Sequence, residues 1–380
     1  MSKKRKIVII GSAYPFRGGG LSTYNERLAR AFIQNGDDVV IHTFSLQYPN
    51  FLFPGKTQYS DSPPPKDLNI KITVNSINPF NWIIIGRKLR KYKPDIVIIK
   101  FWIPFMGPCL GTIARLIKKN KHSKIISIID NIIPHEKRLG DWALAKYFVK
   151  AVDGFVAMSV SVLDDLEKFD STKPKLFCAH PLYDSYGDII PKEIAKQKLG
   201  LDFSLKYLLF FGFIRNYKGL DLLLEAFSLC VKKNTSLRLL VAGEFYTDSS
   251  PYFEIIKKHN LEEFVLMHND FIPDEKVAEY FCASDLVAQP YKNATQSGVT
   301  QIAYHFNKPM IVTNVGGLAE IVPHNKVGYV IKPDAHEIAE AILKFYDEGK
   351  EEEFSRNAEI EKVRYSWDNM VNAIDKLVIR

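Results

Sequence analysis

The amino-acid sequence predicts an α/β protein made of two doubly wound domains with a cleft between their strand ends. Two arrays of short apolar strands alternating with amphipathic helices lead to this prediction, and the alternation pauses over residues 182–191. The length agrees, because 380 residues exceed the roughly 250–300 at which a single hydrophobic core stops growing. We therefore expect one domain over residues 1–186 and a second over 187–362, followed by a terminal helix over 363–380.

The composition argues against membrane-spanning, secreted and zinc-binding proteins. Hydrophobic residues make up 46% of the chain and charged residues 25%, which is ordinary for a globular protein. No apolar run approaches the about 18 residues of a spanning helix, and the first residues lack the features of a cleavable signal. The four cysteines are far apart without a CxxC pair, so we expect buried free thiols. These features predict a cytoplasmic protein without a metal site.

Charge is shared unevenly between the two halves of the chain. Lys and Arg minus Asp and Glu is 28 − 15 = +13 for residues 1–185 and 23 − 28 = −5 for residues 186–380. A basic first half indicates an acidic partner or an anionic membrane surface. Nucleic acid explains this charge less well, because no recognised reader motif accompanies it.

The first array opens with a strand at residues 6–10, a glycine-rich loop and a helix from Leu21 to Gln34. Gly18, Gly19 and Gly20 allow the backbone to approach a ligand closely at a helix N-terminus that attracts anions, although a turn without a ligand also explains them. The loop is not GxGxxG, which disfavours a dinucleotide fold. The remaining expected elements are strands at 39–43, 95–100, 124–129 and 154–159, helices at 82–92, 110–117 and 161–169, and an irregular loop at 44–68.

Two features of the first array suggest contact with a ligand or a membrane. The helices at 82–92 and 110–117 have basic ends with aromatic residues nearby, which fits peripheral membrane contact or ordinary solvated surface helices. His135 and Glu136 follow the strand at 124–129. A histidine there is suited to general base catalysis or to electrostatic stabilisation, and it is equally explained as a surface residue.

The second array contains the stretch around which the function is organised. A strand at 285–288, a polar loop, a helix from Gly298, a strand at 310–312 and a glycine turn before a helix with Glu320 follow one another. Both polar loops lie at the carboxyl ends of strands, the edge where open parallel sheets bind ligands. The other expected elements are strands at 207–212, 237–243, 264–268 and 328–331, helices at 220–231, 274–283 and 335–346, and a helical tail over 351–377.

Two cations in the loop after the strand at 207–212 predict a diphosphate site. Arg215 and Lys218 lie three residues apart, with Gly219 at the start of the next helix. A guanidinium fork and an ammonium at a helix N-terminus suit a diphosphate better than solvent. The loop lacks the GxxxxGK[ST] pattern, which disfavours ATP-driven phosphoryl transfer.

With these segments in order, the chain resembles the GT-B glycosyltransferases of family 4, the retaining sugar-nucleotide-dependent transferases. The likeness covers nearly the whole chain through GGG at 18–20, FGFIRNYKG at 211–219, AG at 242–243, ASDLVAQP at 283–290, QIAYHFNKP at 301–309 and NVGGLAE at 314–320. It implies two Rossmann-like domains, with acceptor bound by the first and donor by the second. It also implies a last helix that crosses back to the first domain.

The resemblance also assigns site residues. Arg215 and Lys218 correspond to the catalytic cations that neutralise the donor diphosphate without a metal, and His135 to the residue that contacts the sugar. Gly18, Gly19, Gly20 and Gly212 would lie near the diphosphate or sugar. Two departures stand out: Phe213 follows Gly212 where the family commonly has Arg, and Thr295 and Ile302 occupy the positions of two usual glutamates. Ile302 fits a helix core, so Thr295, Gln296, Ser297 and Gly298 remain to bind the sugar, with Glu320 as the nearby acid or as a simple helix-start carboxylate.

We expect a retaining, metal-independent hexosyltransferase acting in cell-surface polysaccharide biosynthesis. The donor would be a UDP- or GDP-linked sugar, used as a co-substrate without any other cofactor, and the acceptor a glycan or lipid-linked hydroxyl. The basic first domain would contact the inner face of the cell membrane peripherally. Two alternatives remain open: a sugar-nucleotide-binding subunit with little activity, suggested by the missing glutamates, and a GT-B nucleotide-sugar epimerase using His135, Glu136 and Glu320.

Overall fold

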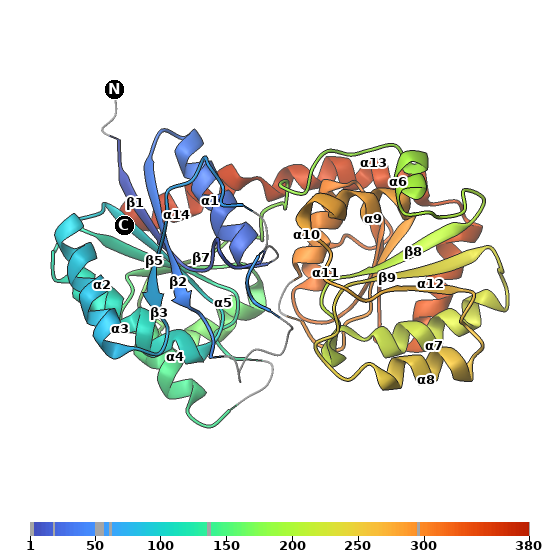
Figure 1. The fold of residues 1–380 in the computed structure, drawn as a ribbon, viewed down its shortest axis with the longest axis horizontal. Helices are drawn as coiled ribbons and strands as arrows, with labels where there is room; N and C mark the ends of the chain where they lie inside the picture. The colour runs from blue at the N-terminus through green and yellow to red at the C-terminus, as the bar shows by residue number, and fades with distance from the viewer. Residues whose placement is uncertain are drawn as a thin grey trace. The chain divides into compact units, whose positions relative to one another are not determined.

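The protein folds into two compact units, each a parallel sheet between layers of helices (Figure 1). Unit 1 comprises Met1–Pro181 and Ser366–Arg380, and unit 2 comprises Leu182–Tyr365. The computed structural model describes residues 4–17, 20–49, 57–60, 63–134, 138–294 and 297–379. The prediction of two doubly wound α/β domains is confirmed.

The sheet of unit 1 has the strand order β3-β2-β1-β4-β5-β6-β7, and neighbouring strands are parallel. The order reverses between β1 and β4, which places a ligand-binding crevice at the carboxyl ends of these strands in folds of this kind. Both faces of the central strands are buried, as their apolar sequences require. The strands are β1 (Lys6–Ile10), β2 (Asp38–Leu46), β3 (Ile70–Asn75), β4 (Ile96–Phe101), β5 (Lys124–Ile129), β6 (Gly154–Ala157) and β7 (Lys175–Phe177).

Local sequence explains how the helices of unit 1 begin and pack. The Asn78 side chain accepts hydrogen bonds from the backbone of the first turn of α2, and Pro79 follows it at the first helical position. Gly86 lets α2 approach α3 closely, since a Cβ there would lie 2.7 Å from the Leu116 side chain. The helices are α1 (Ser22–Gln34), α2 (Pro79–Tyr92), η2 (Pro104–Met106), α3 (Gly107–Lys118), α4 (Asp141–Val149), α5 (Val160–Glu167) and α14 (Trp367–Ile379).

The sheet of unit 2 repeats this topology, with the order β10-β9-β8-β11-β12-β13 and a reversal between β8 and β11. Its strands are β8 (Lys206–Phe211), β9 (Leu237–Ala242), β10 (Val265–His268), β11 (Leu286–Gln289), β12 (Met310–Thr313) and β13 (Gly328–Ile331). Its helices are α6 (Lys192–Lys198), η3 (Asn216–Lys218), α7 (Leu220–Val231), α8 (Ser250–Lys258), η4 (Asp274–Lys276), α9 (Val277–Ala283), α10 (Gly298–His305), α11 (Leu318–Ile321), α12 (Ala335–Asp347), α13 (Glu351–Glu361) and η5 (Lys362–Tyr365).

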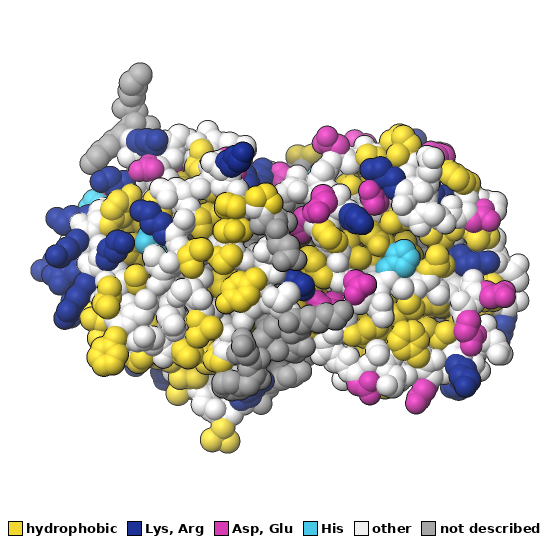
Figure 2. Space-filling view, viewed as in Figure 1, with side chains coloured by type: hydrophobic (Ala, Val, Ile, Leu, Met, Phe, Trp, Pro, Cys, Tyr) yellow, Lys and Arg dark blue, Asp and Glu magenta, His cyan; other side chains and the backbone are white. Residues whose placement is uncertain are grey.

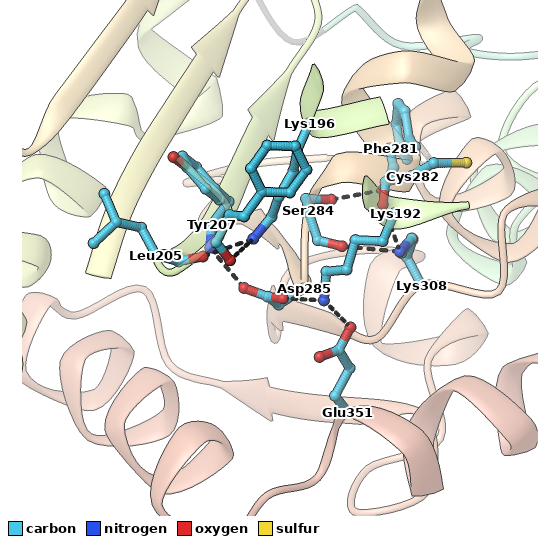
Figure 3. A network of polar contacts seen from close by, with 11 residues as sticks. Lys192, Lys196, Leu205, Tyr207, Phe281, Cys282, Ser284, Asp285, Lys308 and Glu351 are labelled. Atoms are coloured by element: carbon cyan, nitrogen blue, oxygen red, sulfur yellow. Dashed lines mark hydrogen bonds and ion pairs between the residues drawn. The ribbon is translucent and has the colours of Figure 1, made fainter. Parts of the chain in front are cut away.

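An ion-pair network around the buried Asp285 fastens α6 and α13 to the sheet of unit 2 (Figure 3). Asp285, only 1% exposed, pairs with the Lys192 ammonium and accepts a 2.6 Å hydrogen bond from the backbone N–H of Tyr207. Lys192 also contacts Glu351, 2.5 Å away at the start of α13. Because Asp285 directly precedes β11 and Tyr207 lies in β8, the network ties both helices to the amino ends of the two central strands.

Several elements depart from the sequence-based expectations. Strand β2 extends to Leu46, into the segment expected to be an irregular loop, and β3, β7, α4, α6 and α8 were not expected. The helical tail is broken by η5. The break is fixed by Tyr365, whose hydroxyl donates to the Ile321 carbonyl at 3.1 Å and whose own carbonyl accepts from the Leu182 N–H at 2.9 Å. These are long-range contacts that helical periodicity does not reveal.

Candidate functional site

The loops after β8 and β9 run side by side beyond the end of the sheet of unit 2. The Gly212 N–H donates to the Ala242 carbonyl at 2.9 Å, and the Ile214 N–H donates to the Glu244 carbonyl at 2.8 Å. Gly243 has φ +149°, and a Cβ there would lie 2.2 Å from the Gly212 carbonyl oxygen. Glycine is therefore required for this close approach. The two loops form one rigid edge on which the predicted cations stand.

Arg215 and Lys218 lie together in this edge, on either side of the turn η3. Lys218 is only 9% exposed, and its Nζ would lie 3.0 Å from a Cβ added to Gly212. Within the described ranges, neither cation makes a hydrogen bond or an ion pair through its side chain. Burial, and then the charge of Arg215, lower the pKa of Lys218 to about 7. A buried cation beside a second one, without an acidic partner, is an arrangement that an anion would complete.

Gly219 connects this cation pair to helix α7. It has φ +69°, and a Cβ there would lie 2.0 Å from the Pro290 carbonyl oxygen, which only glycine allows. The contact brings the end of η3 against the loop after β11. There the Lys218 Nζ lies 5.6 Å from the ring centroid of Tyr291. The switch point between β8 and β11 thus holds both cations next to the N-terminus of α7, the position that the sequence led us to expect.

The loop between β11 and α10 contributes the next predicted group. Ser297 is 5% exposed, with its Oγ 3.2 Å from the Tyr291 hydroxyl. Gly298 opens α10 against the ring of Tyr183, where a Cβ would approach to 2.8 Å. Ile302 is 4% exposed and packs in the core, as expected. Thr295 and Gln296 lie outside the described residues.

The other predicted residues are not joined to this cation pair by any described contact. Glu320 is exposed on the short helix α11, after β12. Gly20 is exposed two residues before α1 in unit 1, whereas Gly18, Gly19 and His135 lie outside the described residues. The structure therefore brings together Gly212, Arg215 and Lys218, with Ser297 and Gly298 in the neighbouring loop.

Unit 1 has a buried polar cluster that the sequence did not point to. Lys100, at the carboxyl end of β4, is 1% exposed and lies 2.8 Å from the carboxylate of Asp130, the residue after β5. Its Nζ also lies 3.4 Å from the ring centroid of Tyr24, which packs edge-on against His180. Burial, and then the Lys100 charge, lower the pKa of His180 to about 3. The lysine resembled an ordinary strand-end residue because its charge partners are distant in sequence.

The described residues contain neither a candidate membrane span nor a candidate metal-binding cluster. No helix among them is long and apolar enough to cross a membrane. No group of three or more His, Cys, Asp or Glu side chains among them is arranged to hold a metal ion. The cysteines are free, as expected, and all are buried except Cys178, which is half-buried.

Comparisons with known proteins agree with the fold and the domain order. Residues 18–181 match the model of Glycosyltransferase Family 4, and residues 191–361 match that of Glycosyl transferases group 1. The chain is 27% identical over 197 residues to a D-inositol 3-phosphate glycosyltransferase of Gordonia bronchialis, a match covering 48% of this chain and 42% of that protein. The chain thus spans less than half the length of this curated relative.

Solved structures share the architecture over nearly the whole chain. Sucrose-phosphate synthase from Thermosynechococcus elongatus superposes with a TM-score of 0.76 and 15% identity, covering 98% of both chains. The HepE protein of Anabaena, in complex with UDP and glucose, superposes with a TM-score of 0.72 and 15% identity, also covering 98% of both. Identities this low show the fold alone. Two successive family models and this shared architecture together place the chain in the GT-B glycosyltransferases, with a family 4 domain followed by a group 1 domain.

Proposed function

We propose that this chain is a retaining glycosyltransferase that moves a sugar from a nucleoside diphosphate donor to a hydroxyl of a glycan or lipid-linked acceptor. Unit 2 would bind the donor and unit 1 the acceptor, in the biosynthesis of cell-surface polysaccharide. The observation that carries the proposal is the pair of buried Lys218 and half-buried Arg215, which lacks an acidic partner among the described residues. The UDP complex of the structurally similar HepE protein supports a UDP-linked donor, and a GDP-linked donor is the alternative.

In the proposed reaction, the bond between the anomeric carbon and the donor diphosphate breaks while a bond to the acceptor oxygen forms on the same face. The acceptor proton passes to the departing phosphate oxygen. Arg215 offers a planar fork of N–H donors to the diphosphate, and Lys218 offers a compact charge at the start of α7. Because Lys218 is shielded from water, its interaction with the growing negative charge is strong. These two cations would stabilise the leaving group without a metal.

Binding of nucleotides provides the first test. Thermal shift and calorimetry with UDP, GDP, ADP and their common sugars should identify one nucleotide class, and Arg215→Ala/Lys218→Ala should abolish its binding. Loss of both charge-assisted contacts predicts a fall in affinity of about 100-fold or more. The matched control is Lys332→Ala, which removes an exposed lysine that pairs with Glu337 elsewhere in unit 2. This variant should bind the nucleotide with unchanged affinity. No binding of any diphosphate at millimolar concentration would refute the proposal.

Product analysis then separates transfer from its two rivals. Transfer to an acceptor, with the anomeric configuration retained, is the expected outcome. Nucleotide binding without hydrolysis or transfer would instead identify a binding subunit, the rival favoured by Ile302, which is buried where the family usually has a glutamate. Conversion of the donor without any acceptor would identify an epimerase.

We also propose that unit 1 contacts an anionic membrane at the cytoplasmic face. Residues 68–129 contain 12 Lys or Arg and a single acidic residue, Asp95, a net of 12 − 1 = +11. Dark blue side chains gather over α2 and α3 at the left of Figure 2. The outward side of α2 adds apolar groups, because Phe80 is 78% exposed and Ile84 63% exposed one turn before Arg87 and Lys88. Apolar side chains followed by cations on one helix face are typical of interfacial helices.

Vesicle sedimentation of the full chain tests this contact. Binding to vesicles containing phosphatidylglycerol, but not to pure phosphatidylcholine, is expected. Phe80→Ser/Ile84→Ser and Lys88→Glu/Lys91→Glu should each weaken it at least about ten-fold, since each cation alone contributes about five-fold. The matched control is Phe253→Ser on α8 of unit 2, which removes an exposed phenylalanine elsewhere. Equal binding by all variants, or no binding, would contradict the proposal.

A further inference from the structure

An aromatic stack lies directly beside Arg215 in unit 2. The guanidinium carbon of Arg215 is 5.1 Å from the ring centroid of Tyr246. The ring of Phe213 stacks on Tyr246 with centroids 4.3 Å apart and planes inclined by 28°, and it stacks on Phe271 at 6.2 Å and 27°. These rings come from the loops after β8, β9 and β10, three adjacent strands. Phe213 occupies the position after Gly212 where the resemblance led us to expect an arginine.

Backbone hydrogen bonds fix the tyrosine relative to the arginine. The Tyr246 N–H donates to the Ile214 carbonyl at 2.9 Å, and the Ile214 N–H donates to the Glu244 carbonyl at 2.8 Å. Ile214 therefore continues the parallel ladder past the end of β8, paired with Phe245. Since Ile214 immediately precedes Arg215, the backbone that carries the guanidinium is held against the backbone that carries the ring.

The way in which Arg215 is held leaves its hydrogen-bond donors available. An arginine is usually oriented by a carboxylate, which occupies two of its five N–H donors. No hydrogen bond or ion pair joins the Arg215 side chain to the described part of the chain, and its described neighbour is the Tyr246 ring. A ring attracts the cation through its π-electrons and restricts its motion without using those donors. Lys218 differs in being buried, with its Nζ 5.6 Å from the ring centroid of Tyr291.

We infer that Tyr246 is a positioning residue, which holds the Arg215 guanidinium ready for the two phosphates of the donor. This inference rests on the proposed binding of a nucleoside diphosphate at the cation pair. Phe213 stacks on the Tyr246 ring and so supports it. Position 213 therefore carries a supporting ring, and the arginine that contacts the diphosphate is Arg215, two residues later. The interaction requires an aromatic face and does not require the tyrosine hydroxyl.

Calorimetric titration of the full chain with UDP, uridine and inorganic pyrophosphate tests the inference. Tyr246→Leu should weaken UDP and pyrophosphate binding about five- to thirty-fold, the range expected for a partly desolvated cation–π contact. Tyr246→Phe should stay within about two-fold of the wild type, because it keeps the ring. Uridine lacks phosphate, so its affinity should be the same for all three proteins.

A double-mutant cycle separates positioning of Arg215 from a general structural effect. In an Arg215→Ala background, Tyr246→Leu should change UDP affinity less than two-fold, because the group it positions is gone. The matched control is Phe264→Leu, which removes the ring under Arg238, 4.8 Å away, in another cation–π pair of unit 2. That variant should bind UDP like the wild type.

Three results would overturn the inference. Tyr246→Leu could bind UDP as well as the wild type, Tyr246→Phe could be as weak as Tyr246→Leu, or the loss could persist in full without Arg215. Each of these leaves the proposed function standing, because the wild type still binds UDP. Failure of the wild type to bind UDP, GDP, ADP or pyrophosphate would refute the proposed function and the inference together.

Discussion

Replacing Lys218 by methionine should make unit 2 more stable while removing its affinity for the donor. Methionine keeps the length of the buried stem and removes an ammonium that has no acidic partner among the described residues. The pKa of Lys218 is about 7 in the folded protein, whereas an unperturbed lysine, as in the unfolded chain, has a pKa of 10.5. Between these two pH values the unfolded chain therefore binds more protons than the folded protein. Stability from this residue therefore rises with pH across that window and is lowest below pH 7.

The size of the effect follows from these two pKa values. Lys218 opposes folding by about 5 kcal/mol at pH 6 and by about 3 kcal/mol at pH 8.5, according to proton linkage. The stability gained by Lys218→Met should thus be about 2 kcal/mol larger at pH 6 than at pH 8.5. Comparing the stability gain at the two pH values cancels the contribution of every other titrating group that the substitution does not affect.

Urea denaturation can be followed separately in the two units. The four tryptophans, Trp82, Trp102, Trp142 and Trp367, all lie in unit 1, so their fluorescence reports on that unit, whereas circular dichroism reports on both. The substitution should shift the transition that circular dichroism detects and leave the fluorescence transition unchanged. An equal gain at both pH values would show that the pKa of Lys218 is not lowered. A loss of stability at both would show that an acidic group pairs with it.

Three further predictions concern unit 2. The affinity for a UDP-sugar should fall about ten-fold from pH 6 to pH 8 as Lys218 loses its proton, and binding at pH 8 should take up nearly one proton, measured by calorimetry in buffers of different ionisation enthalpy. Gly243→Ala should destabilise unit 2 by about 3 kcal/mol or more, because φ is +149° and the new Cβ would lie 2.2 Å from a carbonyl oxygen. The control, Gly200→Ala at φ +65° in open space, should lose only about 1 kcal/mol in the same urea denaturation. Lys192→Met should lower the free energy of unfolding by about 3–5 kcal/mol, because it leaves the buried Asp285 carboxylate without its cation. A change below about 1 kcal/mol would show that the pair is not important for stability.

Short-range patterns in the sequence were enough to predict the fold class and the cation loop. Apolar runs of strand length, helical periodicity and glycines at the strand ends are local features, and each determines a local conformation. Gly212, Arg215, Lys218 and Gly219 lie within eight residues, so their grouping at a strand end did not depend on any distant segment. The comparisons later confirmed the family that these motifs indicated.

Edge elements and helix breaks were predicted less well. Strands β3 and β7 are at the two edges of the unit 1 sheet, where one-sided pairing needs fewer apolar residues and leaves a weaker pattern. Position 365 looked like part of one long helix, because the hydrogen bonds that end the helix come from residues far away in sequence.

The amino-acid sequence by itself determined that this protein has two doubly wound units and a cationic loop at a strand end, because those properties depend on neighbouring residues. Only the tertiary structure decided the state of each charge. The pKa of Lys218 is unusually low because packing excludes water around it and Arg215 lies nearby, while no described residue supplies an acid. Lys100, which is buried even more deeply, has Asp130, and Arg215 has the ring of Tyr246. Burial and the choice of partner arise from packing between segments, which no local pattern encodes.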